Sequence, residues 1–180
     1  MLNIYRTSRG FGVHSPFAFN LITRVLRERS PYYSYEEVTD TLDANGLLSS
    51  RNIHTSKLLM RLAYKFLPEE IILKGDDALK FKPLSLLIEE NLGQERKSAA
   101  LYFLSGKNLN LNETASGAGK IFEGRNILLA DVENLSEETL HMLQSVKSAR
   151  TDGMTFSSSR GYLLMVGNKY LPRQDFKLKF

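Results

Sequence analysis

Short apolar runs alternate with helical patterns through the middle of this chain, and this alternation limits the possible folds more than any other feature. Residues 71–73, 99–104 and 126–130 are short runs of strand length, and all of them except Asn126 are apolar or aromatic. A helical pattern that opens at Pro83 separates the first two runs, and another, reaching about Ala149, follows the third. Strands separated by helices are typical of a mostly parallel sheet with helices on both faces. The chain is therefore expected to be a Rossmann-like α/β protein.

Three helical patterns precede the first strand, and each has start or stop signals such as a capping serine or a proline. The expected helices run from Pro16 to Pro31, from Ser34 to near Gly46, and from Thr55 or Ser56 to Pro68. They indicate an N-terminal helical segment, residues 1–50, ahead of a Rossmann-like unit, residues 51–180, the two forming one compact body. Closing strands near 154–156, 162–166 and 176–180 lack helical spacers, which favours an antiparallel C-terminal edge.

The composition restricts the chemistry. The chain has no cysteine, so disulfides and thiolate metal sites are excluded. Its three histidines, His14, His54 and His141, lie far apart without ligand spacing, and no metal site is expected. The longest apolar runs are far shorter than the ~20 residues that span a bilayer, and the first residues lack a signal-peptide core. The expectation is a cytoplasmic protein with no membrane partner.

The net charge of +4 is unevenly distributed. Residues 1–30 contain five arginines and one acid, and residues 160–180 contain five basic residues and one acid, so each end carries +4 and the remainder carries −4. A basic face could attract phosphate or an acidic partner. The alternative is a set of solvated helix faces and a basic tail. Because aromatic and basic residues are not interleaved, nucleic acid is not an expected partner.

Candidate binding residues follow the first strand, because parallel α/β sheets bind ligands at the carboxyl ends of their strands. Gly75, Asp76 and Asp77 occupy that position. A nucleotide-type turn needs several glycines for close approach of the backbone to a ligand, and this turn has one. The two acids would also repel a phosphate. The residues are read either as a cofactor-binding turn or as an ordinary polar turn.

Asp131 and Glu133 follow the third strand. Paired acids there could take a proton or hold a divalent cation. They could equally precede a helix, where acids favour the positive end of the helix dipole, and Asn134 with Glu137 has the spacing of a capping box. Residues 116–120 resemble a phosphate-binding loop, but Thr114 and Ile121 break that pattern and we reject it.

Residues 12–17, Gly-Val-His-Ser-Pro-Phe, and residues 32–36, Tyr-Tyr-Ser-Tyr-Glu, carry a resemblance to a known family. Together with the helix and strand at 57–73 and the closing residues 161–180, this chain resembles a group of bacterial class I S-adenosylmethionine-dependent methyltransferases found in Bacteroidetes. The likeness is strongest in the N-terminal third and at the end of the chain. It implies a methyltransferase fold with the cofactor held at the first strand.

The departures from that family matter for function. The resemblance implies an acid where Leu73 stands and a second glycine where Leu79 stands, so that a side chain occupies the place of the methionine part of the cofactor. It also implies a ribose-binding acid at the end of the second strand, where this chain has Ser105. Asp131 matches one acid of a later motif, but its neighbours Ala130 and Val132 do not complete it.

The sequence therefore predicts a degenerate, non-catalytic methyltransferase-like protein with a binding or interaction role and no cofactor. Its partner would be an unidentified protein or small molecule, and no particular oligomeric state is predicted. The first alternative is an active small-molecule methyltransferase that uses Gly75, Asp76 and Asp77 for S-adenosylmethionine and Asp131 as the catalytic residue. The second is a phosphate- or nucleic-acid-binding module that uses the basic ends, which requires the two ends to face one another in space.

Overall fold

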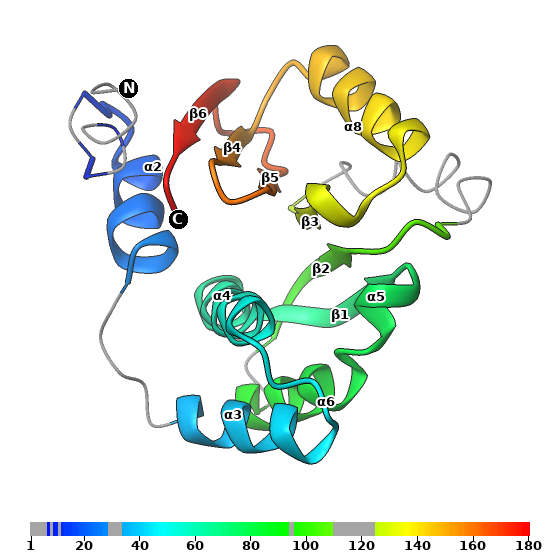
Figure 1. Ribbon diagram of the computed structural model, residues 1–180. Coiled ribbons are helices and arrows are strands. Elements are labelled where there is room, and N and C mark those ends of the chain that lie inside the picture. Colours follow the sequence, from blue (N-terminus) through cyan, green and yellow to red (C-terminus); the bar gives the residue numbers. More distant parts are fainter. Residues whose placement is uncertain (1–6, 8, 11, 29–33, 94–95, 110–124) are drawn as a thin grey trace.

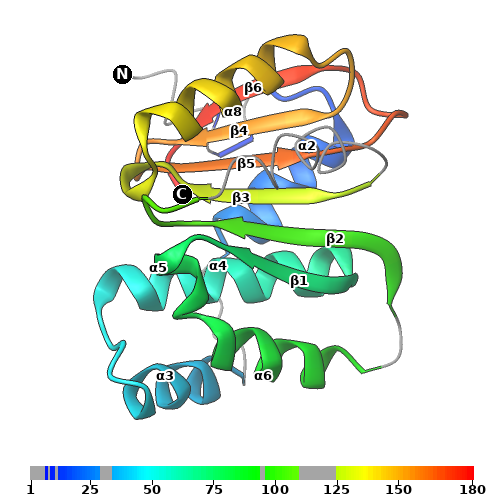
Figure 2. The same ribbon diagram turned by 90° about the vertical axis from the view of Figure 1, so that its right-hand side faces the viewer.

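A mixed six-stranded sheet forms the centre of the molecule (Figures 1 and 2). The computed structural model describes residues 7, 9–10, 12–28, 34–93, 96–109 and 125–180. The strand order is β1-β2-β3-β5-β4-β6, and only β5 runs against its neighbours. The strands are β1 (Pro68–Lys74), β2 (Lys97–Leu104), β3 (Ile127–Asp131), β4 (Met154–Ser158), β5 (Tyr162–Val166) and β6 (Gln174–Leu178). The predicted α/β fold class is confirmed.

Helices cover both faces of the sheet (Figures 1 and 2). One face packs on α8 (Glu137–Ala149), and the other on α2 (Pro16–Leu21), the π-helical turn η1 (Ile22–Leu26), α4 (Ser50–Phe66) and α6 (Lys82–Leu92). A further helix, α3 (Ser34–Ala44), packs on α4 and α6. Two short elements, α5 (Asp76–Leu79) and the 3-10 turn η2 (Val132–Asn134), follow β1 and β3. None of the described helices combines the length and the apolar character needed to cross a bilayer.

Side chains along each strand point alternately to the two faces of the sheet, so the hydrophobic core has two parts, one on each face. Leu101 and Phe103 of β2 face α4 and α6, where the Phe103 ring meets Phe81 edge-on at 5.4 Å between centroids. Leu104 and Leu128 face the smaller cluster beneath α8. Successive side chains of a strand point to opposite faces, so both faces of a buried strand must be apolar. The larger cluster joins residues from α2 to β6, and the division into residues 1–50 and 51–180 stays a prediction.

Two helix starts differ from the sequence expectation. α4 begins at Ser50, five residues before Thr55, because the Ser49 hydroxyl caps the helix by accepting a hydrogen bond from the Asn52 amide at 3.1 Å. α8 is capped by Ser136 and not by Asn134, which the sequence predicted as a capping residue. The Asn134 side chain instead donates a hydrogen bond to Asp131. The earlier start of α4 places additional polar side chains at the edge of the sheet.

The first helix also ends differently. It passes from α2 into η1 and stops at Leu26, where the Arg27 amide donates to the Ile22 carbonyl in the five-residue π pattern. Pro31, Tyr32 and Tyr33 lie outside the described residues, as do residues 110–124, which include the rejected phosphate-loop sequence.

The C-terminal strands include the expected antiparallel hairpin, formed by β4 and β5. The outermost strand, β6, pairs in parallel with β4, so β5 lies inside the sheet between β3 and β4. Five of the six described strands therefore run in one direction, and their carboxyl ends meet at one edge (Figure 2). The residues that follow these ends begin at Gly75, Ser105, Val132, Ser159 and Lys179.

Candidate functional site

A cavity of about 300 Å³ lies at the carboxyl ends of β1, β2 and β3, where the sequence predicted a site. Asp77, Ser105 and Asp131 line it together with the loop between α3 and α4. Gly75 and Asp76 lie in the same turn as Asp77 but do not line the cavity. The fold thus brings together the predicted residues of two separate strands, and the cavity has the size of a small-ligand site.

The Gly75 turn is packed against the protein's own backbone. Gly75 has a φ of +99°, and a Cβ placed on it would lie 2.3 Å from the Ser105 carbonyl oxygen. That oxygen accepts a hydrogen bond from the Ala78 amide at 2.9 Å, and the Ser105 amide donates to the Lys74 carbonyl at 3.1 Å. The glycine is therefore needed for close contact between the ends of β1 and β2.

The two acids after Gly75 also have partners within the protein. Asp76 accepts hydrogen bonds from the Asp77 amide at 3.2 Å and from the Asn108 side-chain amide at 3.1 Å. Asp77 forms an ion pair with Lys80 at 2.5 Å, and this hydrogen bond raises the pKa of Lys80 above its ordinary value. These contacts are of the kind found in an ordinary polar turn, and the role of Gly75, Asp76 and Asp77 in cofactor binding stays a prediction.

Asp131 is a buried carboxylate, 3% exposed, that is paired on both oxygens. The Arg51 guanidinium donates to Oδ1 through Nη2 and to Oδ2 through Nε at 3.3 Å, and the Asn134 side-chain amide donates to Oδ2 at 2.9 Å. The hydrogen bond to Asp131 raises the pKa of Arg51 above its usual range. A bidentate guanidinium pair of this kind is the strong form of ion pair.

Arg51 also joins Asp131 to its neighbours. Its Nη1 atom donates to Glu133 at 2.6 Å, and its guanidinium lies 5.3 Å from the centre of the Tyr162 ring. The Tyr162 hydroxyl lies 2.7 Å from the Thr55 hydroxyl, and burial raises the pKa of Tyr162. These contacts fix the first turns of α4 on β3 and β5. The role of Asp131 as a base or metal ligand stays a prediction, and within the described chain no three potential metal ligands gather.

The expectation that the Leu79 side chain fills the predicted cofactor position is wrong. Leu79 is 58% exposed at the end of α5 and does not line the cavity. α5 is only one turn long, so its last residue points to solvent, and Phe81 closes this side of the cavity. Leu73 is half-buried against the larger core cluster.

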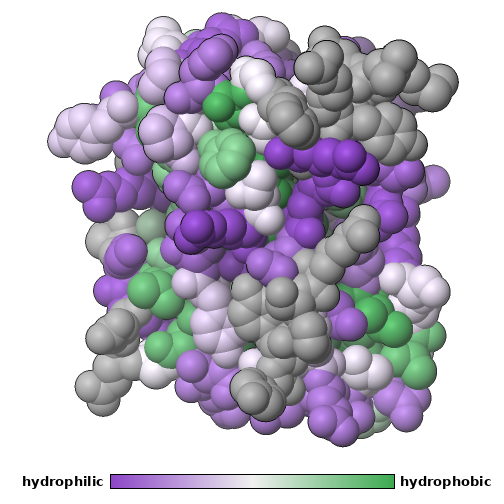
Figure 3. Space-filling model, turned by 90° about the vertical axis from the view of Figure 1, so that its left-hand side faces the viewer, coloured by the Kyte–Doolittle hydropathy of each residue, from purple (hydrophilic) through white to green (hydrophobic). Residues whose placement is uncertain are grey.

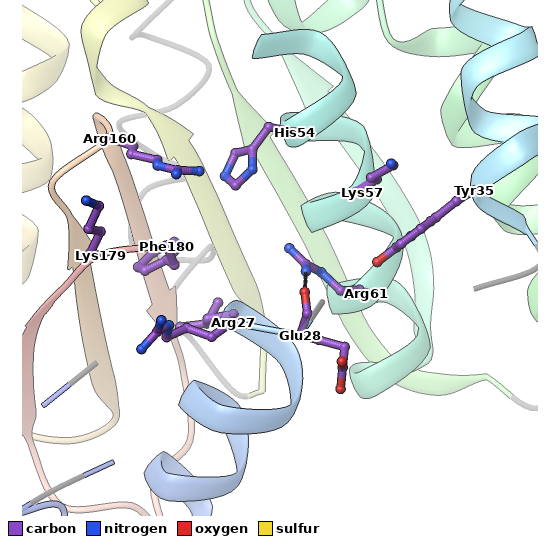
Figure 4. A pocket seen from close by; sticks show the side chains of 10 residues that line it. Arg27, Glu28, Tyr35, His54, Lys57, Arg61, Arg160, Lys179 and Phe180 are labelled. Atoms are coloured by element: carbon purple, nitrogen blue, oxygen red, sulfur yellow. Dashed lines mark hydrogen bonds between the residues drawn. The ribbon is translucent and has the colours of Figure 1, made fainter. Parts of the chain in front are cut away.

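A second cavity, of about 420 Å³, lies farther along the same edge, between α4 and the end of β6 (Figure 4). Arg27, from the basic N-terminal part of the chain, and Lys179, from the basic C-terminal part, both line it. His54, Lys57 and Arg61 of α4 line the opposite side of the cavity (Figure 4). One residue from each basic end of the chain thus lines this cavity, and the phosphate-binding alternative stays a prediction.

Sequence reasoning did not identify Arg51, His54 or Arg61 as site residues. The sequence did contain a signal for the earlier helix start, because serine is a preferred N-cap residue. In the structure the Ser49 hydroxyl accepts a hydrogen bond from the Asn52 amide, three residues later. A helix that starts there places His54, Lys57 and Arg61, spaced i, i+3 and i+7, along one face. The start expected at Thr55 left His54 outside the helix and hid this pattern.

The pKa of His54 is lowered to about 4, first by burial and then by the positive charges of Arg160, Arg61 and Arg51. An unfolded histidine titrates near 6.5. Between these values the unfolded chain binds a proton that the folded protein does not, so stability falls as the pH drops from about 6.5 to about 4. The charged groups around this histidine are Arg51, Arg61, Arg160 and Lys179, with the Tyr162 ring at 5.6 Å.

We expect His54→Gln to flatten this pH dependence. Between pH 6.5 and 4.5 the wild-type protein should lose about 1–2 kcal/mol more stability than the variant, after allowance for the partial exposure of the ring. Thermal unfolding of both proteins across this range measures the difference, because every other titratable group is the same in the two proteins. Parallel curves for the two proteins would contradict the assignment.

No family model matches the chain, and neither does any curated protein or solved structure. The geometry of the two cavities is therefore what indicates a function.

Proposed function

We propose that this protein is a methyltransferase-like α/β protein that acts by binding a partner and not by methyl transfer. The family resemblance implies a mostly parallel sheet with an antiparallel strand near its C-terminal side. The sheet of this protein is consistent with that arrangement. The cavity at the carboxyl ends of β1 to β3 lies where such a protein would hold its cofactor. The residues around that cavity do not fit S-adenosylmethionine.

The observation that carries this proposal is the closure of the Gly75 turn. A cofactor turn uses glycine so that a ligand can approach the backbone. In this protein the space beside Gly75 is taken by the Ser105 carbonyl, and Leu109 lies 3.4 Å from the same position. The glycine that the resemblance assigns to cofactor binding therefore has a structural role between two strands.

Two further features support the proposal. Ser105 stands where the family would place the ribose-binding acid, and its backbone groups bond to Lys74 and Ala78. A missing charge-assisted hydrogen bond weakens binding by about 1.5–3 kcal/mol. In addition, nucleotide-binding crevices form at the point where the order of parallel strands in a sheet reverses. The described parallel strands β1, β2, β3, β4 and β6 follow one another across the sheet in chain order, so they form no such point.

Titration calorimetry with S-adenosylmethionine tests the proposal. We expect no saturable binding at concentrations up to about 1 mM, because the turn is closed and the ribose acid is absent. S-adenosylhomocysteine and adenosine, titrated in the same way, separate the nucleoside from the amino-acid part. A circular dichroism melt of the same sample shows that the protein is folded. A micromolar dissociation constant for any of the three molecules would favour the active methyltransferase and overturn the proposal.

A further inference from the structure

The 420 Å³ cavity is walled by five separate parts of the chain: the end of η1, α3, α4, the turn after β4 and the end of β6. On the side of the molecule where η1 and β6 lie, hydrophilic side chains extend across the middle of the surface (Figure 3). The cavity has the volume of a site for a small molecule. Because its walls come from distant segments, only the folded chain presents it.

Positive charge is in excess around this cavity. Its permanent cations are Arg27, Lys57, Arg61, Arg160 and Lys179, and its one acidic side chain is Glu28. The Glu28 carboxylate points away from the other labelled side chains (Figure 4). Like charges held around a concave surface attract and concentrate anions.

Two of the cations have fixed positions. Arg61 is 8% exposed, and its Nη1 atom donates to the Glu28 carbonyl at 2.5 Å, which keeps a guanidinium in the wall of the cavity. The Lys57 ammonium lies 4.7 Å from the centre of the Tyr35 ring. Groups that are positioned before binding lose little conformational freedom when a ligand arrives.

Arg160 and His54 provide the groups that lack partners within the described chain. The Arg160 guanidinium makes no hydrogen bond or ion pair among these residues and points toward the His54 ring (Figure 4). The Nε2 atom of His54 is buried and has no hydrogen-bond partner among the same residues. A buried polar atom without a partner is costly, and a group from outside the chain would satisfy it.

We propose that this cavity binds a small molecule through a phosphate group, with Arg160, Lys57 and Arg61 neutralising the phosphate and His54 donating one neutral hydrogen bond. This inference rests on the proposed binding role and names the ligand class. Arginine forks match phosphate oxygens, and several cations suit a multiply charged group better than a single carboxylate. A concave cavity of about 420 Å³ suits a small molecule better than nucleic acid, which needs an extended basic surface with stacking aromatics.

Pyrophosphate is the probe that tests the inference, because it carries the charged group without a nucleoside. At low salt we expect calorimetry to give a dissociation constant below about 1 mM. Arg160→Gln should weaken binding at least about fivefold, since it removes a charge-assisted hydrogen bond. Lys177→Gln is the matched control: it removes the same charge from an exposed position on β6 outside the cavity, and should change the affinity less than about twofold.

A second measurement reports the location of the ligand. Bound phosphate opposes the cations that depress the pKa of His54, so pyrophosphate should shift the imidazole NMR signals of His54 and raise that pKa. Absence of binding at 10 mM pyrophosphate, equal losses in the two variants, or binding of a single-stranded oligonucleotide alone would each overturn the inference. None of these results bears on the S-adenosylmethionine titration, so the proposed non-catalytic role stands or falls separately.

Discussion

Gly75→Ala is expected to lower the melting temperature by on the order of 10 °C in the absence of any ligand. The new Cβ would lie 2.3 Å from the Ser105 carbonyl oxygen, and the φ of +99° is one that side chains rarely adopt. Backbone strain and overpacking each cost about 1–3 kcal/mol. In a chain of this size each kcal/mol corresponds to about 2–4 °C.

Gly46→Ala is the matched control for this prediction. Gly46 also has a positive φ, +66°, but a Cβ there would have no atom within 4 Å. Its replacement should cost about 1 kcal/mol, the ordinary penalty for a side chain in the left-handed region. If Gly75 were kept to admit a ligand, the space beside it would be open, and both variants would lose the same amount. Differential scanning fluorimetry of the two proteins therefore distinguishes a structural glycine from a ligand-binding one.

Arg51→Met is expected to destabilise the protein by about 3 kcal/mol, because it leaves the buried Asp131 carboxylate without its cation. We place the loss at the lower end of the range for buried pairs, since the Arg51 side chain is 37% exposed and solvent screens part of the interaction. Methionine retains most of the aliphatic length of the arginine, so the lost packing is small. Denaturant unfolding measures the change in free energy.

Two variants control for the loss of the arginine itself. Glu133→Gln removes the exposed partner of the same guanidinium and should change stability by less than about 1 kcal/mol. Adding Asp131→Asn to Arg51→Met removes the buried charge and should restore much of the stability, because the destabilising group is the unpaired carboxylate. An Arg51→Met variant as stable as Glu133→Gln would show that this ion pair does not hold α4 on the sheet.

These two variants probe different contacts at one edge of the sheet, where we propose that no cofactor binds. Gly75 is backed by the protein's own backbone, and Asp131 is neutralised by the protein's own arginine. The proposed ligand site lies farther along the edge, in the basic cavity, where the Arg160 guanidinium and the His54 Nε2 atom have no hydrogen-bond partner in the described part of the chain.

Much of the fold could be predicted because it depends on local patterns. Residues 71–73, 99–104 and 127–130 lie in parallel strands, one residue short of the expected start of the third, and Pro83 and Gly93 bound α6 as their backbone preferences indicate. The start of α4 differs from the expectation because Ser49 caps the helix about two turns before the apolar stripe begins at Leu58. The place of β6 at the outer edge could not be predicted either, because pairing between strands depends on the whole sheet.

The sequence by itself determined the order of strands and helices and therefore the edge at which Gly75, Asp77 and Asp131 gather, because periodicity and capping act over a few neighbouring residues. Only the tertiary structure decided what those residues contact. Arg51 contacts Asp131 across 80 residues of chain, and Arg27 and Lys179 line one cavity. Such pairings are fixed by how helices pack on the sheet, and that packing is a property of the whole core and of no single segment.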